Sequence, residues 1–420
     1  MSTATAKATP AKKRGAGLLQ GLQKIGRSLQ LPIAVLPAAA ILLRLGQDDI
    51  FGKKGLGWDK VAAVFNSAGG ALLDASLGLP LLFCIGIAIG FAKKADGSTA
   101  LAAVAGFLVY HNVLTAFPME GTVTKAAPAG TPPNPSVLGG IVMGLLAAVV
   151  WQRFHRTKLV DWLGFFNGRR LVPILMAFIG VIVGVLLGLV WGPVGDALNA
   201  FSDWLIGLGS VGSGLFGLFN RALIPVGMHQ FLNTFFWFQV GDFTNSAGQV
   251  VHGDIPRFLA GDGSAGQFTS GFFPIMMFGL PAAALAIVHS ARPERRKVVG
   301  GMMLSIALTS IVTGVTEPIE FTFMFIAPLL YIIHAVLTGV AMFATWSLGV
   351  HDGFGFSAGL FDYILNWNLA TKPWMIIPIG LAFGAVYYFV FRFAISKFNI
   401  KTPGREDEEE SAAAEAELTK

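Results

Sequence analysis

Two carboxylic acids lie in an otherwise uncharged, strongly apolar stretch of the chain. Residues 298–350 contain only Glu317 and Glu320 as charged residues, both within the segment TGVTEPIEF. A charged side chain in such a stretch is costly to bury and usually serves a function. Pro318 can neither continue a helix nor donate a backbone hydrogen bond. The segment therefore predicts a polar ligand site at a helix break, with Glu317 in it.

The alternative for this segment is that a carboxylate pairs with a basic residue and holds helices together. For Glu320, three residues after Glu317, this structural role and ligand binding both stay open.

A second group of polar residues lies in the segment FNRALIPVGMHQFLN. Arg221 is the only charged residue in 204–241, and His229 follows a proline and a glycine that break a helix. Gln230 and Asn233 add amide groups that can both donate and accept hydrogen bonds. A lone histidine in an apolar segment often only joins two helices. The break, the arginine and the amides together favour a ligand site.

These side chains suit a neutral ligand with many hydroxyl groups. Carboxylate and imidazole accept from hydroxyls, the guanidinium and the amides donate, and Trp237 offers a ring face. Metal binding is not expected, because His and acidic residues do not cluster at ligand spacing. No glycine-rich loop followed by Lys-Ser or Lys-Thr is present, so nucleotide binding and cofactors are not expected either. The single cysteine, Cys84, lies in LPLLFCIGIAIGF and is interpreted as a packing residue.

The elements that must position these residues are membrane helices. The chain is 54% hydrophobic and only 13% charged, against about 25% charged in ordinary soluble domains. Its apolar runs are continuous and approach the roughly 20 residues that cross a bilayer as a helix. The sequence predicts an all-α integral membrane protein with about ten transmembrane helices and one or two re-entrant elements, the segment 222–240 among them.

Expected spans lie near 29–45, 77–92, 98–117, 136–152, 171–192, 204–220, 269–289 and 374–396, with further helices in 298–350. An interfacial helix is possible within 46–76, and an amphipathic helix is expected at 18–30. Glycines spaced four apart, at 140 and 144 and at 180, 184 and 188, permit close helix contact. Packing within one chain is favoured for them over contact between protomers.

Charge in the loops gives the expected orientation. Basic residues gather at 93–94, 153–170, 292–297 and 397–405, and such loops face the cytoplasm. Both termini are then cytoplasmic, and the net charge of +6 reports topology rather than nucleic-acid binding. Residues 1–17 form a basic tail without the features of a signal peptide. Residues 401–420 form an acidic tail that is expected to be disordered.

Several of these segments resemble one family. GVTEPIEFTFMFIAPLLYIIHAVLTG resembles the signature of the membrane channel (IIC) of glucose-superfamily phosphotransferase permeases. FNRALIPVGMHQFLNTFFWFQVGDFTN and GDIPRFLAGDGSAGQFTSGFFPIMMFGLP resemble the N-acetylglucosamine branch, and LQKIGRSLQLPIAVLPAAAILLRLG is similar to the family's amino-terminal segment. The resemblance covers about 18–405.

The resemblance implies a multi-pass protein of the bacterial cytoplasmic membrane that takes up N-acetylglucosamine or a related hexose. It implies a homodimer, with an amino-terminal scaffold half at 18–200 and a carboxy-terminal sugar-transport half at 201–400. Glu317 and His229 would hold the sugar and serve in catalysis, and Arg221 would belong to the site. Gln230, Asn233 and Glu320 complete the predicted sugar-binding set.

In many relatives, the sequence after KTPGRE continues into a IIB domain whose cysteine carries the phosphoryl group, whereas here an acidic tail follows. We therefore expect the membrane subunit of a protein-N(pi)-phosphohistidine–sugar phosphotransferase that is inactive without a separate phosphorylated IIB protein. Two alternatives are a secondary transporter that couples sugar to protons through Glu317, and a sugar sensor or scaffold without flux. The three hypotheses predict different outcomes. The phosphotransferase subunit delivers sugar phosphate, the secondary transporter delivers free sugar, and the sensor or scaffold binds sugar without uptake.

Overall fold

The computed structural model describes residues 28, 32, 35–74, 76–118, 132–244, 248 and 250–405. Three predicted segments lie wholly or largely outside these residues: the basic tail at 1–17, the helix at 18–30 and the acidic tail at 401–420. The described part is mainly helical, which confirms the all-α class. Its one sheet is a short antiparallel hairpin of β1 (Asp242–Thr244) and β2 (Val250–His252).

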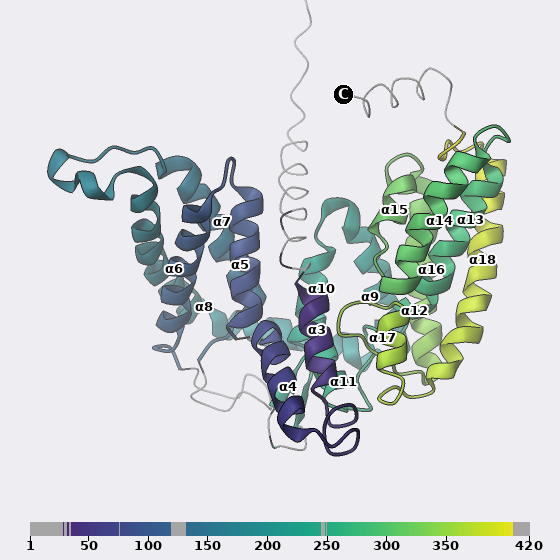
Figure 1. Cartoon of the computed structure of the whole chain (residues 1–420), viewed down its shortest axis with the longest axis horizontal. Coiled ribbons are helices and arrows are strands. Elements are labelled where there is room, and N and C mark those ends of the chain that lie inside the picture. The colour runs from purple at the N-terminus through teal and green to yellow at the C-terminus, as the bar shows by residue number, and fades with distance from the viewer. Residues whose placement is uncertain are drawn as a thin grey trace, which may run out of the picture.

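The first half of the chain forms a helix bundle that occupies one side of the molecule (Figure 1). Its helices are α5 (Gly78–Phe91), α6 (Gly97–Leu114), α7 (Ser136–Phe154) and α8 (Leu171–Gly207). Before them, α3 (Leu36–Leu45) pairs with α4 (Asp59–Leu73), and the short turns η1 (Asp161–Phe166) and η2 (Gly168–Arg170) precede α8. Phe107, Met143, Trp151 and Met176 are buried at the centre of the bundle.

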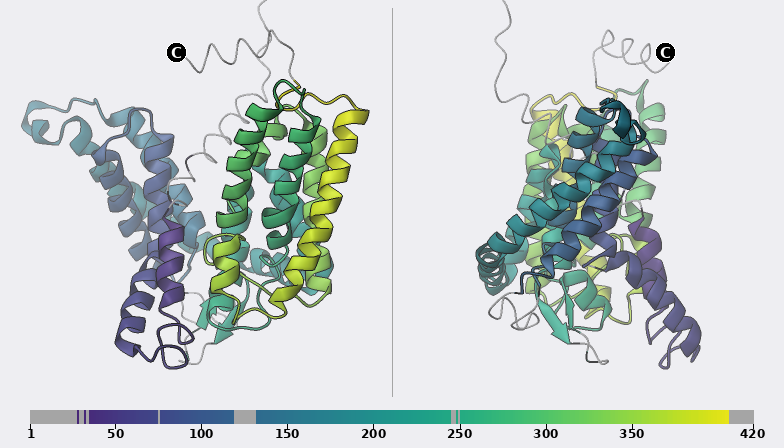
Figure 2. Two further views of the ribbon diagram at one scale, coloured as in Figure 1. Left: turned by 45° about the vertical axis from the view of Figure 1, so that its right-hand side comes forward. Right: turned by 90° about the vertical axis from the view of Figure 1, so that its left-hand side faces the viewer.

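The second bundle lies on the other side, with α3 and α4 between the two in Figure 1. Figure 2 shows the whole molecule from two further sides, with the second bundle in front in the left view and the first bundle in front in the right view. The second bundle consists of α9 (Ser210–Leu223), η3 (Ile224–Val226), α10 (His229–Phe238), α11 (Asp254–Leu259), α12 (Phe272–Pro274), η4 (Ile275–Gly279), α13 (Leu280–Ser290), α14 (Arg296–Thr313), α15 (Glu317–Met324), α16 (Pro328–Ser347), α17 (Leu360–Leu365), η5 (Pro373–Met375) and α18 (Ile376–Lys397). Helix α9 packs on α16, and α13 packs on α14 and α18.

Seven helices in the described residues are long and apolar enough to cross a membrane, or eight if the bent pair α4–α5 counts as one span. The expected number of about ten is not confirmed. One difference is that 204–220 is not a separate span. Helix α8 continues for 37 residues to Gly207, and Gly209, with φ of 55°, separates it from α9. At about 1.5 Å per residue, α8 is much longer than a bilayer core is thick.

The glycines spaced four apart pack within the chain. A Cβ on Gly180 would lie 2.5 Å from the Gly106 carbonyl oxygen, and one on Gly140 would lie 2.2 Å from the Pro80 carbonyl oxygen. These glycines therefore let α8 approach α6 and α7 approach α5, which confirms the intramolecular interpretation.

Cys84 is a core residue of the first bundle. Its side chain is fully buried, and Sγ lies 3.6 Å from the Ala103 carbonyl oxygen. The predicted packing role is confirmed.

Aromatic rings fill the core beside α9 and α10. The Phe236 ring centroid lies 5.2 Å from that of Phe216 and 4.6 Å from that of Phe268, while Phe272 lies 6.2 Å from Phe216. This cluster joins the loop before α12 to both helices. The cluster packs against α9 and α10, the two helices that carry Arg221 and His229.

Candidate functional site

Both predicted helix breaks are present in the structure. Helix α14 ends at Thr313, Gly314 adopts a left-handed conformation with φ of 74°, and α15 begins at Glu317. In the other segment, α9 ends at Leu223, Gly227 has φ of 73°, and α10 begins at His229. Glycine tolerates such positive φ values, which end helices readily. Glu317 and His229 are therefore each the first residue of a helix.

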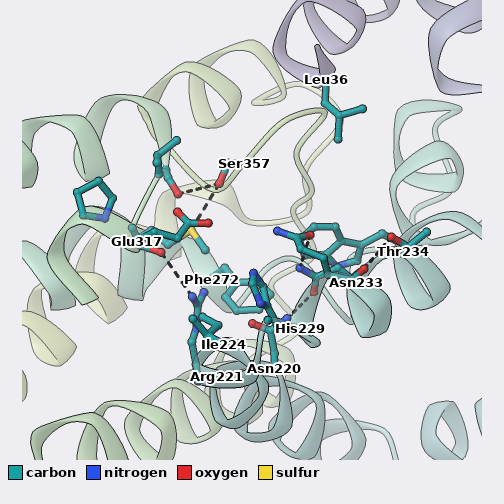
Figure 3. A pocket seen from close by; sticks show the side chains of 18 of the residues that line it. Leu36, Asn220, Arg221, Ile224, His229, Asn233, Thr234, Phe272, Glu317 and Ser357 are labelled. Carbon is teal, nitrogen blue, oxygen red and sulfur yellow. Dashed lines mark hydrogen bonds between the residues drawn. The ribbon is translucent and has the colours of Figure 1, made fainter. Parts of the chain in front are cut away.

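The two breaks line one cavity of about 820 Å³. Of the six predicted site residues, five line this cavity: Arg221, His229, Gln230, Asn233 and Glu317. Figure 3 shows Glu317 on one side of it, with His229 and Asn233 on another. Glu320 does not line the cavity and lies behind its wall, fully buried. Folding thus brings together two segments that are far apart in the sequence.

Polar groups of Glu317 and His229 remain available to a ligand. No side chain of the described residues donates a hydrogen bond to the Glu317 carboxylate. The buried Nδ1 atom of His229 also has no partner in this part of the chain. Buried polar atoms are normally hydrogen-bonded, so Nδ1 of His229 is a candidate for a contact with a ligand hydroxyl. Glu317 is half-buried and lines the cavity, so a ligand can reach its carboxylate.

Arg221 is held in the cavity wall by residues of the opposite break. Its Nη1 atom donates to Glu320 Oε1 at 2.7 Å and lies 3.4 Å from Thr316 Oγ1. The guanidinium carbon lies 4.9 Å from the centroid of the Phe272 ring. Nε of Arg221 has no partner among the described residues. Arg221 therefore keeps donor capacity while its charge is balanced by Glu320.

An amide network forms a further part of the wall. Asn220 Nδ2 donates to Asn233 Oδ1, and Asn233 Nδ2 donates to Gln230 Oε1 at 3.3 Å. Thr234 Oγ1 donates to the Gln230 backbone carbonyl at 2.7 Å. The network fixes the amides of Asn233 and Gln230, so their free donors and acceptors present a set pattern to a ligand.

Some residues of this region were missed by the sequence reasoning. Asn220 directly precedes Arg221, so its position was a usable signal. His334, a hydrogen-bond partner of Glu320, is a polar residue in an apolar run, which was also a usable signal. Ser357 lines the cavity from the segment between α16 and α17 and bonds the Gly314 carbonyl at 2.8 Å. Nothing in the sequence relates Ser357 to the helix break.

No group of three or more His, Cys, Asp or Glu residues in the described part is placed to hold a metal ion. The cavity instead combines one open carboxylate, one imidazole, one guanidinium and several amides, beside the ring of Trp237. Broken helices that present such groups among apolar spans are typical of transporters. The fold and the site together define a multi-pass membrane transport protein.

Comparison with known proteins gives the family. The family model "Phosphotransferase system, EIIC" matches residues 26–339, and the chain belongs to this family. The chain is 74% identical to the N-acetylglucosamine-specific EIIC component of Streptomyces coelicolor, over 98% of both chains. It is 49% identical to the N-acetylglucosamine-specific EIICBA component of Escherichia coli, over 95% of this chain and 58% of that protein.

It is also 47% identical to the N-acetylglucosamine-specific EIICB component of Bacillus subtilis, over 93% of this chain and 80% of that protein. The predicted membership in the phosphotransferase system and the N-acetylglucosamine branch is confirmed. A proton-coupled secondary transporter is not favoured.

Proposed function

We propose that this chain takes up N-acetylglucosamine by group translocation. The observation that carries the proposal is the 74% identity, over 98% of both chains, to the N-acetylglucosamine-specific component of S. coelicolor. Identity falls to 43% for the glucosamine-specific component of B. subtilis and to 44% for the glucose-specific component of Staphylococcus carnosus. The acetamido sugar is therefore the best-supported substrate.

The cavity supplies the chemistry that such a sugar needs. Its volume of about 820 Å³ lies within the roughly 300–1,000 Å³ of small-molecule sites. Glu317 accepts hydrogen bonds from sugar hydroxyls, Arg221 donates them, and the amides of Gln230 and Asn233 do both. Trp237 offers an apolar ring face. Glu320 contributes indirectly, through Arg221.

The phosphoryl group comes from a phosphorylated IIB protein. A sugar hydroxyl attacks the phosphorus, the bond to the IIB cysteine breaks, and the hydroxyl proton passes to a base. His229 is our candidate for that base because a histidine can accept a proton near neutral pH. Glu317 orients the hydroxyl and balances the charge that develops on His229.

A separate IIB protein is supported by Cys84. A phosphoryl-accepting cysteine must reach soluble proteins as a thiolate, whereas Cys84 is 0% exposed inside a helix bundle. The S. coelicolor relative, which this chain matches over 98% of its length, is named as an EIIC component alone.

The two halves have different roles in this proposal. Almost all residues that line the cavity belong to 220–357, with Leu36 and Phe83 as the exceptions. We assign sugar transport to 201–400 and assign 18–200 to a scaffold that also joins two protomers in a homodimer. Both termini face the cytoplasm of the bacterial cell, as the basic loops indicate.

Uptake into membrane vesicles tests the proposal. Vesicles that contain the purified full chain receive labelled N-acetylglucosamine, with and without a phosphorylated IIB protein. Labelled sugar phosphate that forms only with phosphorylated IIB is the expected result. Free labelled sugar that accumulates with a proton gradient would instead support a secondary transporter. Binding without any uptake would support a sensor.

A further inference from the structure

Behind the cavity, Arg221 is the first of four buried polar side chains that come from four helices. Arg221 Nη1 lies 2.7 Å from Glu320 Oε1, and His334 Nε2 lies 3.2 Å from the same oxygen. On the far side of the ring, His334 Nδ1 lies 2.8 Å from the Tyr387 hydroxyl. Arg221 is 4% exposed, and the other three are 0% exposed. The row thus connects α9, α15, α16 and α18.

The directions of these hydrogen bonds follow from the groups involved. A carboxylate that pairs with arginine only accepts hydrogen bonds. Nε2 of His334 must therefore carry the hydrogen that it shares with Glu320. In a neutral imidazole the other nitrogen then accepts. The Tyr387 hydroxyl lies 2.8 Å from Nδ1 and 3.3 Å from the His334 backbone carbonyl, so it donates to Nδ1 as the nearer acceptor. Tyr387 orients His334, and His334 orients Glu320.

The orientation of the Glu320 carboxylate decides which carboxylate the Arg221 guanidinium pairs with. Both donors meet on Oε1 of Glu320, while Oε2 has no partner in the described part of the chain. Glu317 is the competing acceptor because it lines the same cavity as Arg221 and directly follows Thr316, which Arg221 contacts. Figure 3 shows the Arg221 side chain pointing toward the segment that carries Glu317. At low dielectric a released guanidinium would be drawn strongly to an unpaired carboxylate.

We propose that His334 is a positioning residue of the sugar site. By donating to Glu320, it keeps that carboxylate turned toward Arg221 and so prevents Arg221 from pairing with Glu317. Glu317 then stays open to the sugar. The inference rests on the proposed function, since it treats this cavity as the sugar site. If the role of His334 were purely structural, the four side chains would only hold four helices together. Loss of His334 would then not change which carboxylate Arg221 pairs with.

Sugar binding to the purified full chain is the first test. His334→Leu removes both ring nitrogens, while His334→Gln restores an N–H toward Glu320. Loss of a hydrogen bond to a charged group predicts N-acetylglucosamine binding weaker by about tenfold or more in His334→Leu. His334→Gln should recover most of the affinity. Thr345→Val is the matched control, because Thr345 is fully buried in the same helix outside the row; its affinity should not change.

The second test needs no sugar. Glu317→Gln is made in the wild-type chain and in His334→Leu, and the midpoint of thermal unfolding is measured for all four proteins. In the wild-type chain the change should leave the midpoint unchanged or raise it, because Glu317 has no side-chain partner to lose. In His334→Leu it should lower the midpoint, because the new pair with Arg221 is lost. If Glu317→Gln changed the unfolding midpoint in the same direction in the wild-type chain and in His334→Leu, the inference would be overturned.

The two tests separate this inference from the proposed function. If the wild-type chain does not bind N-acetylglucosamine, the proposed substrate is wrong, and the unfolding measurements still decide the role of His334. If His334→Leu does not fold, His334→Asn takes its place, since the shorter amide reaches toward Tyr387 and leaves Glu320 without its donor. Affinity equal to wild type in that variant would also overturn the inference.

Discussion

Glu317 and His229 are each the first residue of a helix, and both helices begin at the wall of one cavity (Figure 3). The first N–H groups of a helix have no carbonyl partner within it. Such groups are tolerated among membrane spans only where they are buried in protein or line a cavity. The breaks therefore place polar side chains and polar backbone at the same site.

Replacement of Glu317 by Gln should greatly weaken sugar binding. In the proposed site the carboxylate accepts hydrogen bonds from sugar hydroxyls, and removing a charged acceptor costs about 1.5–3 kcal/mol, roughly tenfold to more than a hundredfold in affinity. Equilibrium binding of labelled N-acetylglucosamine to the purified chain measures the loss. Glu294→Gln, in the exposed loop before α14, is the control. Normal uptake by Glu317→Gln would exclude Glu317 from the site.

Replacement of His229 by Ala should reduce phosphorylation more than sugar binding. A base that acts in the transition state contributes about 10²–10⁴-fold to the rate, whereas one hydrogen bond contributes much less to binding. The comparison is between the turnover rate with saturating phosphorylated IIB and the dissociation constant of the sugar. His111→Ala, in α6 away from the cavity, controls for general effects. Equal losses in rate and affinity would limit His229 to hydrogen bonding.

Replacement of Gly314 by Ala should destabilise the break before α15. Gly314 has φ of 74°, and an added Cβ would lie 2.6 Å from Ser357 Oγ and 2.9 Å from the Ala358 nitrogen. Alanine at positive φ costs about 1 kcal/mol or more. Thermal unfolding in detergent measures the change, which should be accompanied by weaker sugar binding.

Gly301 provides the matched control for that substitution. It lies in α14, where an added Cβ would meet nothing within 4 Å. Gly301→Ala should therefore leave stability unchanged or raise it by up to about 1 kcal/mol. Equal effects at both glycines would contradict the special role of Gly314.

Replacement of Cys84 by Ser should leave sugar phosphorylation intact when IIB is supplied. Cys84 only packs in the core, and a serine hydroxyl can still donate to the Ala103 carbonyl. Without IIB, the general phosphotransferase proteins and IIA should transfer no labelled phosphoryl group to the wild-type chain or to the Cys84→Ser variant. Stable phosphate on Cys84, or activity lost only in the Ser variant, would show that this chain carries the phosphoryl group itself.

Reporter fusions test the orientation in the membrane. A reporter after Pro128 should be external, and one after Arg295 should be cytoplasmic, because basic loops remain inside. The reporter is an enzyme that is active on only one side of the membrane, and its activity is measured for each fusion. The opposite result at either position would require a different order of spans.

The sequence determined the class of this protein and the local features of its site. Long apolar runs define membrane helices, because lipid offers no partner for backbone groups. Pro318 and Gly227 mark the two breaks, since the limits that these residue types place on the backbone are local. Glu317 and His229 stood out because polar side chains are costly in apolar surroundings. The family resemblance added the substrate class.

Only the tertiary structure decided which polar residues meet. Hydropathy does not say where a long helix ends, so the extension of α8 to Gly207 was not expected. Sequence spacing left the role of Glu320 open, whereas packing of α15 against α16 turns this side chain to His334 and Arg221, away from the cavity. The contact of His334 with Tyr387 depends on helices from distant parts of the chain. Such contacts arise from long-range packing, which local residue preferences do not specify.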